Sequence, residues 1–166
     1  MTEATAIRLR DIRPTDLAGI VDLDALRSGE RKCAYWGRIL GRYEATCRGG
    51  AASDGHVALV AVDEHGVLYG FLLGEIRAWE FGSERCGWIF SVSVHPDRER
   101  HGLATQLCEE AIRRFTAMGV ELVRTMVRRD EVPMLALFRN MGFRAGPFSE
   151  LERRVSLGTI EREGAA

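Results

Sequence analysis

The chain has 166 residues, a length that suits one domain with one buried core. Its 23 basic and 24 acidic residues leave a formal charge of -1, which excludes a strong overall field toward nucleic acid or an anionic membrane. We therefore expect neither nucleic acid nor a membrane as a partner.

The cysteines and the amino-terminal residues indicate the compartment. The four cysteines are widely spaced and form no Cys-x-x-Cys pair of the kind that marks zinc or redox sites. The first dozen residues are rich in charge, and no apolar run approaches the ~18 residues needed to span a bilayer. We expect a reduced, cytoplasmic protein without a metal, an export signal or a membrane anchor.

The amino-terminal part of the chain predicts one strand and two helices. Residues 6–12 alternate apolar and charged side chains, as a strand with one buried face does. Thr15 or Asp16 can cap a helix in which apolar residues recur at helical spacing, namely Leu17, Ile20, Val21 and Ala25. A second amphipathic stretch, about 30–47, carries four residues on one side: Cys33, Trp36, Leu40 and Tyr43.

Three strands are expected next. Strands at about 56–63 and 67–79 flank Glu64-His65-Gly66, a hairpin-type turn, so we expect this pair to be antiparallel. A further strand, 87–94, ends at His95-Pro96, because proline cannot donate a hydrogen bond to a ladder.

The remaining elements complete an α/β arrangement. Residues 103–118 predict a helix that packs on a sheet, with Gly119 after its end. Further elements are a strand at 120–127, a short helix at 132–141, and two last strands, one beginning at Gly142-Phe143 and one at 151–155. The order β-α-α-β-β-β-α-β-α-β-β describes an α/β protein with a mixed sheet. We expect one domain over 1–157 and a loose tail over 158–166.

The start of the long helix is a candidate anion site. Backbone N–H groups at a helix opening lack intrahelical acceptors, and the helix dipole favours a negative charge there. Gly102 and Ala104 are small where a phosphate would approach the backbone, while Arg98, Arg100 and His101 can add positive charge. Gly102 serving only a tight turn is the open alternative.

Two motifs carry a resemblance to a known family. Residues 92–104, VSVHPDRERHGLA, resemble the acetyl-CoA-binding motif of the GNAT superfamily of N-acetyltransferases: Val-x-Pro, then Gln/Arg-x-x-Gly-x-Gly/Ala at the start of the long helix. Residues 135–143, LALFRNMGF, resemble the family's Ala-x-x-Leu-Tyr-x-x-x-Gly-Phe helix. The resemblance covers nearly the whole chain and implies the GNAT fold, with a mostly antiparallel mixed sheet and flanking helices.

The resemblance implies a set of residues that bind acetyl-CoA. Backbone groups of Val92 and Val94 would pair with the pantetheine arm like an added strand, and Phe138 would pack near the thioester. Backbone amides would hold the pyrophosphate, from Arg100, His101, Gly102, Leu103, Ala104 and Thr105. Ser91 and Ser93 either face the acceptor or are simply small strand residues.

Several positions depart from the family pattern. The Gln/Arg at the head of the phosphate loop is Glu99, an acid where an anion would bind, and Arg98 and Arg100 beside it are expected to compensate. The tyrosine that protonates the departing thiolate in many members is Phe138, which has no proton to give. Solvent protonation can replace it, because a thiol with a pKa near ~8.5 is a fair leaving group.

The catalytic residues are unknown from the sequence. Two positions that hold a glutamate base in relatives are Trp88 and Met126, and neither side chain can accept a proton. Glu75, Glu80 and Glu84 remain as candidates, each with the alternative of being a solvated surface carboxylate.

The expected mechanism is direct attack by a neutral amine on the thioester in a ternary complex, with a backbone amide near Val94 stabilising the oxyanion. Cys108 lies in an apolar helical context, so we expect a structural thiol rather than a nucleophile.

Acceptor choice is expected to depend on the first two helices and on residues 44–56 and 78–87. Four aromatic residues line an apolar acceptor cleft or belong to the core: Trp36, Tyr43, Trp79 and Phe81.

Three functions stay open. The phosphate-loop and Gly-Phe regions are most similar to bacterial members that acetylate protein N-termini or lysines, so the first is acetyl transfer to a protein or peptide amine. The second is acetyl transfer to a small-molecule amine, and the third is acyl-CoA binding without catalysis. A dinucleotide-binding domain is disfavoured, because no Gly-x-Gly-x-x-Gly follows the first strand. A homodimer also stays open.

Overall fold

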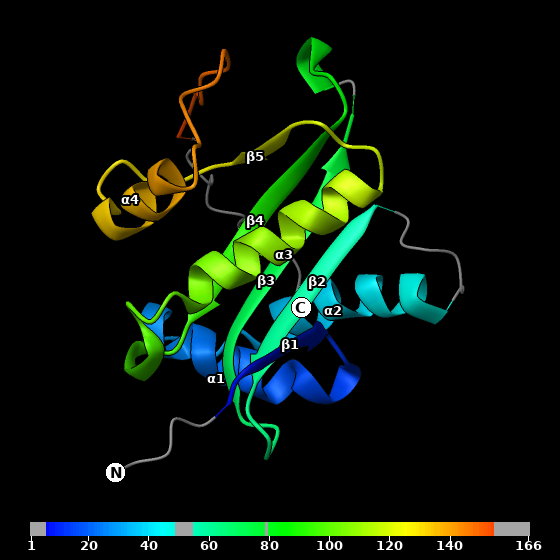
Figure 1. The fold of residues 1–166 in the computed structure, drawn as a ribbon, viewed down its shortest axis with the longest axis vertical. Helices are drawn as coiled ribbons and strands as arrows, with labels where there is room; N and C mark the ends of the chain where they lie inside the picture. The colour runs from blue at the N-terminus through cyan, green and yellow to red at the C-terminus, as the bar shows by residue number, and fades with distance from the viewer. Residues whose placement is uncertain (1–5, 49–54, 79, 155–166) are drawn as a thin grey trace, which may run out of the picture.

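A five-stranded sheet in the order β1-β2-β3-β4-β5 forms the centre of the computed structural model, which describes residues 6–48, 55–78 and 80–154 (Figure 1). The strands are β1 (Arg8–Asp11), β2 (His56–Val62), β3 (Leu68–Arg77), β4 (Cys86–Val94) and β5 (Val123–Thr125). The first four pair antiparallel, and β5 pairs with β4 in parallel. The sheet is therefore mixed and mostly antiparallel, as expected.

Helices cover both faces of this sheet. Two of them, α1 (Leu17–Ser28) and α2 (Cys33–Arg48), pack on one face, and α3 (Leu103–Ala117) packs on the other. The short helix α4 (Val132–Asn140) follows β5 (Figure 1). The hairpin at Glu64-His65-Gly66 is confirmed, and Gly66 there has a φ of 83°, which glycine adopts without strain.

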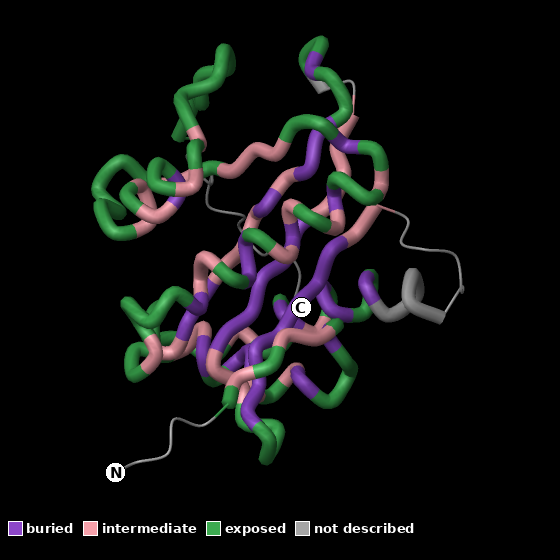
Figure 2. Tube along the Cα trace, in the orientation of Figure 1, coloured by how far each residue is buried: buried purple, intermediate pink, exposed green. Residues whose placement is uncertain are grey.

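Two cores lie on the two faces of the sheet, because side chains alternate along each strand. On β3, Phe71 and Leu73 join the core under α1 and α2, whereas Leu72 joins the core under α3. The strand β2 is apolar after His56 and buried on both faces, so its sequence does not alternate (Figure 2).

The helix α3 lies close to the sheet because glycines face it. An ideal Cβ placed on Gly87 would lie 2.6 Å from the ring of Phe115, and one on Gly74 would lie 2.9 Å from it. The fully buried ring of Phe115 therefore packs directly on the backbone of β3 and β4.

The order of elements from β1 to α4 is confirmed, but the two last predicted strands are absent from the described residues up to 154. Gly142 has a φ of 87°, and the N–H of Phe143 donates to the carbonyl of Phe138 at 2.9 Å. Phe143 therefore folds back on α4 instead of starting a strand. The rest of the predicted strand at 151–155 and the boundary at residue 157 lie outside the described residues.

Two local expectations on the helices are corrected. Trp36, Leu40 and Tyr43 are buried as predicted, but Cys33 is exposed at the start of α2. Asp16 precedes α1, but its carboxylate accepts from the N–H of Arg13 and pairs with Arg10 instead of capping the helix.

Within residues 6–48, 55–78 and 80–154, no helix has both the length and the apolar character that a bilayer crossing requires.

Candidate functional site

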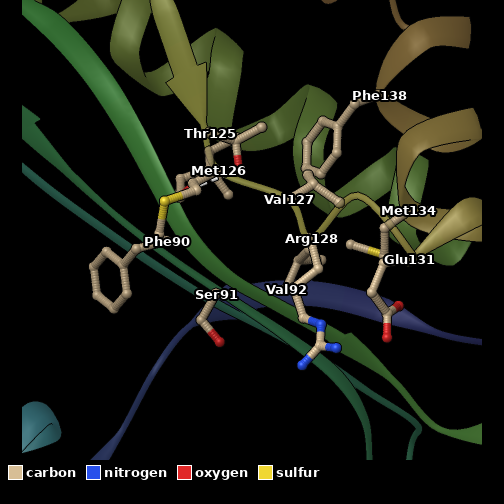
Figure 3. A pocket seen from close by; sticks show the side chains of 11 residues that line it. Phe90, Ser91, Val92, Thr125, Met126, Val127, Arg128, Glu131, Met134 and Phe138 are labelled. Atoms are coloured by element: carbon tan, nitrogen blue, oxygen red, sulfur yellow. Dashed lines mark hydrogen bonds between the residues drawn. The ribbon is translucent and has the colours of Figure 1, made fainter. Parts of the chain in front are cut away.

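A cleft opens where β4 and β5 separate. It has a volume of about 280 Å³ and receives side chains from β4, from β5 with the loop after it, and from α4 (Figure 3). In this view Phe90 of β4 and Phe138 of α4 lie on opposite sides of the opening. The lining residues used below are Phe90, Ser91, Val92, Met126 and Phe138.

The separation follows from an irregularity in β4. Leu73 pairs with Ser91 but Gly74 pairs with Ile89, so Phe90 is an extra residue that bends the strand. β5 pairs with β4 only as far as Ile89, whose carbonyl accepts from Oγ1 of Thr125 at 2.9 Å. Beyond this point, no strand among the described residues pairs with that side of β4.

The unpaired side of β4 exposes the backbone of Val92 and Val94. The N–H of His95 donates to the carbonyl of Tyr69 in β3 at 2.8 Å. Because backbone groups alternate along a strand, those of Val94 and Val92 point away from β3, toward the cleft. This edge can accept an extended ligand as an additional strand.

The loop after β4 leads from this edge to the start of α3. It contains a short 3-10 turn (Pro96–Arg98), and then Arg100 and Gly102 take left-handed φ values of 60° and 78°. Among the described residues, no recorded hydrogen bond uses the N–H of Arg100, His101 or Gly102. A Cβ on Gly102 would meet nothing within 4 Å, so the space before the helix is open to a ligand.

The remaining loop residues lie in the first turn of α3. The side chain of Leu103 is buried in the core under this helix, and Ala104 and Thr105 are half-buried. Their N–H groups are the first of the helix and have no intrahelical acceptor. The N-terminus carries no capping side chain, which leaves these donors available to an anion.

The charge of Glu99 is balanced from a distant part of the chain. Glu99 forms an ion pair with Arg27 in the last turn of α1. The Nη2 atom of Arg27 also lies 3.4 Å from the carbonyl oxygen of Val94. Arg98 lies over the ring of Tyr69, at 4.9 Å from its centroid, and has no contact with Glu99 among the described interactions. The ion-pair partner of Glu99 is therefore Arg27, a residue that the sequence analysis does not single out, and compensation by Arg98 and Arg100 stays a prediction.

The position of the family tyrosine lies in the cleft. Phe138 is buried, lines the cleft, and packs on Phe143 with ring centroids 5.0 Å apart. Met126 lines the same cleft, and Trp88 is half-buried beneath the guanidinium of Arg77 at 4.6 Å. None of these side chains can give or take a proton in the reaction.

A second cavity, of about 460 Å³, lies on the α2 side of the sheet. Tyr35, Arg38, Ile39 and Arg42 line it from one face of α2, and Glu75 and Arg77 line it from β3. Phe90 lines both this cavity and the cleft, so the two spaces lie on either side of the irregularity in β4.

The candidate bases are separated by this geometry. Glu75 lines the second cavity, and its Oε1 accepts from Nε of Arg77 at 2.8 Å. Glu84 is exposed and lines neither space. The side chain of Glu80 and the whole of Trp79 lie outside what the structure describes.

Sequence reasoning missed the cavity-lining face of α2. Trp36 and Tyr43 belong to the core rather than to an acceptor cleft, and Phe81 is 97% exposed. The missed face follows helical spacing, because Tyr35, Arg38, Ile39 and Arg42 are separated by three or four residues. Attention to Trp36 and Tyr43 alone passes over this neighbouring face of the helix.

The strand serines lie on the α2 side. Ser93 pairs with Phe71, whose side chain joins the core on that face, and Ser93 is buried with an Oγ that has no recorded partner among the described residues. Ser91 lines the cleft. Only Ser91 is therefore placed where a bound donor can reach it.

The helix thiol is not placed for nucleophilic attack. Cys108 is fully buried, and burial, with a smaller contribution from Glu109, raises the pKa of its thiol to about 12. A thiol in that state is a poor nucleophile near neutral pH. In the described part of the chain, no three His, Cys, Asp or Glu side chains gather as a metal site.

Curated relatives match parts of the chain. A mycothiol acetyltransferase of Saccharomonospora viridis is 33% identical over 63 residues, which are 38% of this chain and 21% of that protein. A mycothiol acetyltransferase of Arthrobacter sp. (strain FB24) is 28% identical over 85 residues, which are 51% of this chain and 26% of that protein. The chain thus spans about a fifth to a quarter of the length of these relatives.

Solved structures of acetyltransferases superpose on this chain. An aminoglycoside N-acetyltransferase in complex with CoA superposes with a TM-score of 0.74 at 17% identity, over 93% of this chain and 98% of that chain. A ribosomal-protein-alanine N-acetyltransferase from Brucella melitensis biovar Abortus 2308 superposes with a TM-score of 0.70 at 17% identity, over 90% of this chain and 100% of that chain.

The sequence also matches a family model: residues 23–143 match the model of the acetyltransferase (GNAT) family. The chain therefore belongs to the acetyltransferase (GNAT) family, enzymes that take the acyl group from acetyl-CoA.

Proposed function

We propose that the chain transfers an acetyl group from acetyl-CoA to a primary amine of a protein or peptide, by direct attack in a ternary complex. One observation carries this proposal: the cleft beside β4 and the cavity beside α2 are neighbours, because Phe90 lines both. A donor in the cleft and an acceptor in the cavity can therefore approach each other without passing through a covalent enzyme intermediate.

The donor would lie along the free edge of β4. The backbone of Val92 and Val94 would pair with the pantetheine arm, and Phe138 would pack beside its thioester end. The diphosphate would lie against the N–H groups at the start of α3, from Arg100, His101, Gly102, Leu103, Ala104 and Thr105. The open space over Gly102 and the unused N–H groups fit such an anion.

The chemistry requires a neutral amine and a stabilised oxyanion. Glu75 would take the proton of the ammonium group, directly or through water, because it is the candidate carboxylate that lines the acceptor cavity. The amine nitrogen then bonds to the thioester carbon, and a backbone N–H near Val94 stabilises the oxyanion. The C–S bond breaks and the attacking nitrogen loses its extra proton to solvent, which also protonates the thiolate because Phe138 cannot.

A small-molecule amine is the second candidate acceptor. The relatives matched in sequence are mycothiol acetyltransferases, and one similar fold is an aminoglycoside N-acetyltransferase. The missing tyrosine also keeps a non-catalytic acyl-CoA-binding domain as a third candidate. We place the protein in the cytoplasm, where the free thiols of Cys33, Cys86 and Cys108 would stay reduced.

Consumption of acetyl-CoA by the purified chain tests the proposal, against peptides with free amino termini or lysines and against small amines. CoA binding is measured in parallel. Turnover on peptides supports the proposal, and turnover on small amines alone supports the second candidate. CoA binding without turnover on any acceptor supports the non-catalytic domain instead.

A further inference from the structure

The cavity beside α2 is positively charged, and this property bears on the acceptor. Its lining contains three arginines, Arg38, Arg42 and Arg77, and one carboxylate, that of Glu75. The ion pair between Arg77 and Glu75 has a length of 2.8 Å, so Arg77 balances the carboxylate. The positive charge of Arg38 is therefore balanced by none of the described lining residues.

Arg38 is the clearest candidate to bind a ligand. It lies on the exposed part of α2, and none of the described residues forms a recorded hydrogen bond or ion pair with it. Arg77, in contrast, is held by Glu75 and by its stacking over Trp88 at 4.6 Å. A guanidinium that lies beside a cavity and has no recorded acceptor in the described part of the chain favours a carboxylate or phosphate from a ligand.

The two charged ends of the cavity come from different elements. Glu75 lies on β3, close to the sheet, whereas Arg38 and Arg42 lie one turn apart on α2. A ligand that spans the cavity would place its amine toward the carboxylate on the sheet and its anionic group toward the helix. A polycationic acceptor would meet like charges on the helix instead.

We infer that the acceptor is an acidic peptide segment, whose amine enters beside Glu75 and whose neighbouring carboxylate binds Arg38. This inference rests on the proposed function and specifies its substrate. A polycationic amine would be favoured instead by an excess of acidic side chains in the cavity.

A matched set of peptides tests the inference. The peptides share one sequence with a free amino terminus and differ only in their second and third residues, which are acidic, neutral or basic. We expect kcat/KM of the wild type to be roughly tenfold higher for the acidic than for the neutral peptide, and lowest for the basic one. Added salt is expected to raise KM for the acidic peptide most.

Variants assign the preference to the cavity. Arg38→Gln should lower kcat/KM roughly tenfold more for the acidic peptide than for the neutral one, through KM, and Arg38→Glu should reverse the preference. The control Arg113→Gln removes the same charge from the exposed surface of α3, on the other face of the sheet. It should leave all three peptides unchanged.

The possible outcomes separate the inference from the proposed function. Turnover that is equal for the three peptides, or best for the basic one or for an aminoglycoside, overturns the inference but leaves acetyl transfer standing. If no peptide turns over, their affinities in the presence of CoA decide: tighter binding of the acidic peptide, lost in Arg38→Gln, supports the inference, and any other order overturns it. Acetylation of free acidic amino acids and not of peptides would overturn the peptide assignment.

Discussion

Arg27 and Glu99 are 72 residues apart in the sequence and form an ion pair between the end of α1 and the loop before α3. The same guanidinium lies 3.4 Å from the carbonyl oxygen of Val94. One side chain therefore connects α1, the end of β4 and the loop that we assign to the diphosphate. It also explains how an acidic residue can occupy that loop.

Replacing Arg27 tests this connection. Because Glu99 would then present an unbalanced negative charge to the diphosphate, we expect Arg27→Gln to weaken CoA binding roughly tenfold. The double variant Arg27→Gln/Glu99→Gln should recover most of the affinity, as titration calorimetry can measure. The unfolding midpoint should hardly move, since both side chains are 44% exposed and such pairs contribute little to stability. Wild-type affinity in Arg27→Gln would contradict this role.

Gly102 offers a test of the diphosphate site with a matched control. Gly102 and Gly66 have φ values of 78° and 83°, and a Cβ on either would meet nothing within 4 Å. Alanine at each position should therefore cost a similar ~1 kcal/mol of backbone strain in urea unfolding. Only Gly102→Ala should also weaken CoA binding, by tenfold or more, because its Cβ lies where the anion would approach. Equal CoA affinities in the two variants would speak against the site.

Phe138→Tyr tests whether the leaving thiolate needs an acid from the enzyme, because it adds the family tyrosine's hydroxyl group to the cleft. If a CoA thiolate leaves without an enzyme acid, kcat should stay within about threefold of the wild type. The shape of the pH profile of kcat should also stay the same. A tenfold or larger rise in kcat would show instead that protonation of the leaving group limits the natural enzyme.

The contact between Phe115 and the sheet predicts a large loss of stability. A Cβ at Gly87 would lie 2.6 Å from the ring of Phe115, so Gly87→Ala should lower the free energy of unfolding by about 1–3 kcal/mol. The control Gly41→Ala lies on the exposed surface of α2 with nothing within 4 Å of its Cβ. It should raise stability by about 0.5–1 kcal/mol. The opposite ordering in urea unfolding would refute the close approach.

Glu110 predicts an acid-dependent contribution to stability. Hydrogen bonds from Arg113 and Arg114 lower the pKa of its carboxyl from 4.5 to about 2, and Arg114 also pairs with Asp11 of β1. A lowered pKa means that the stabilisation is complete above the unfolded pKa and is lost as the pH falls from about 5 to 2. Glu110→Gln should cost ~1 kcal/mol at pH 7, after allowance for solvent screening, and nothing near pH 2. A constant difference across this range would exclude the effect.

The elements up to α4 could be predicted because their patterns are local. In α3, Leu107, Ala111 and Phe115 recur at helical spacing, and all three are fully buried. The strand predicted at 120–127 shrinks to Val123–Thr125, and at its far end β4 turns away after Ile89 and leaves residues 126–127 without a strand partner. Strand propensity cannot register whether a partner strand is present.

The donor motif could be found from the sequence, but the acceptor cavity could not. The loop at Gly102 is contiguous and has a recognisable spacing, whereas the extra residue Phe90 emerges only when the registers of β3 and β4 are compared. The pair between Arg27 and Glu99 likewise depends on where α1 ends relative to β4. Such features depend on packing between distant segments and leave no local pattern.

A crystal structure of the chain with bound CoA tests the central claim most directly. We predict that the diphosphate accepts hydrogen bonds from the N–H groups at the beginning of α3, around Gly102, while the pantetheine runs along β4 at Val92 and Val94. A diphosphate bound at another place, or a pantetheine arm that leaves the edge of β4 untouched, would contradict the account.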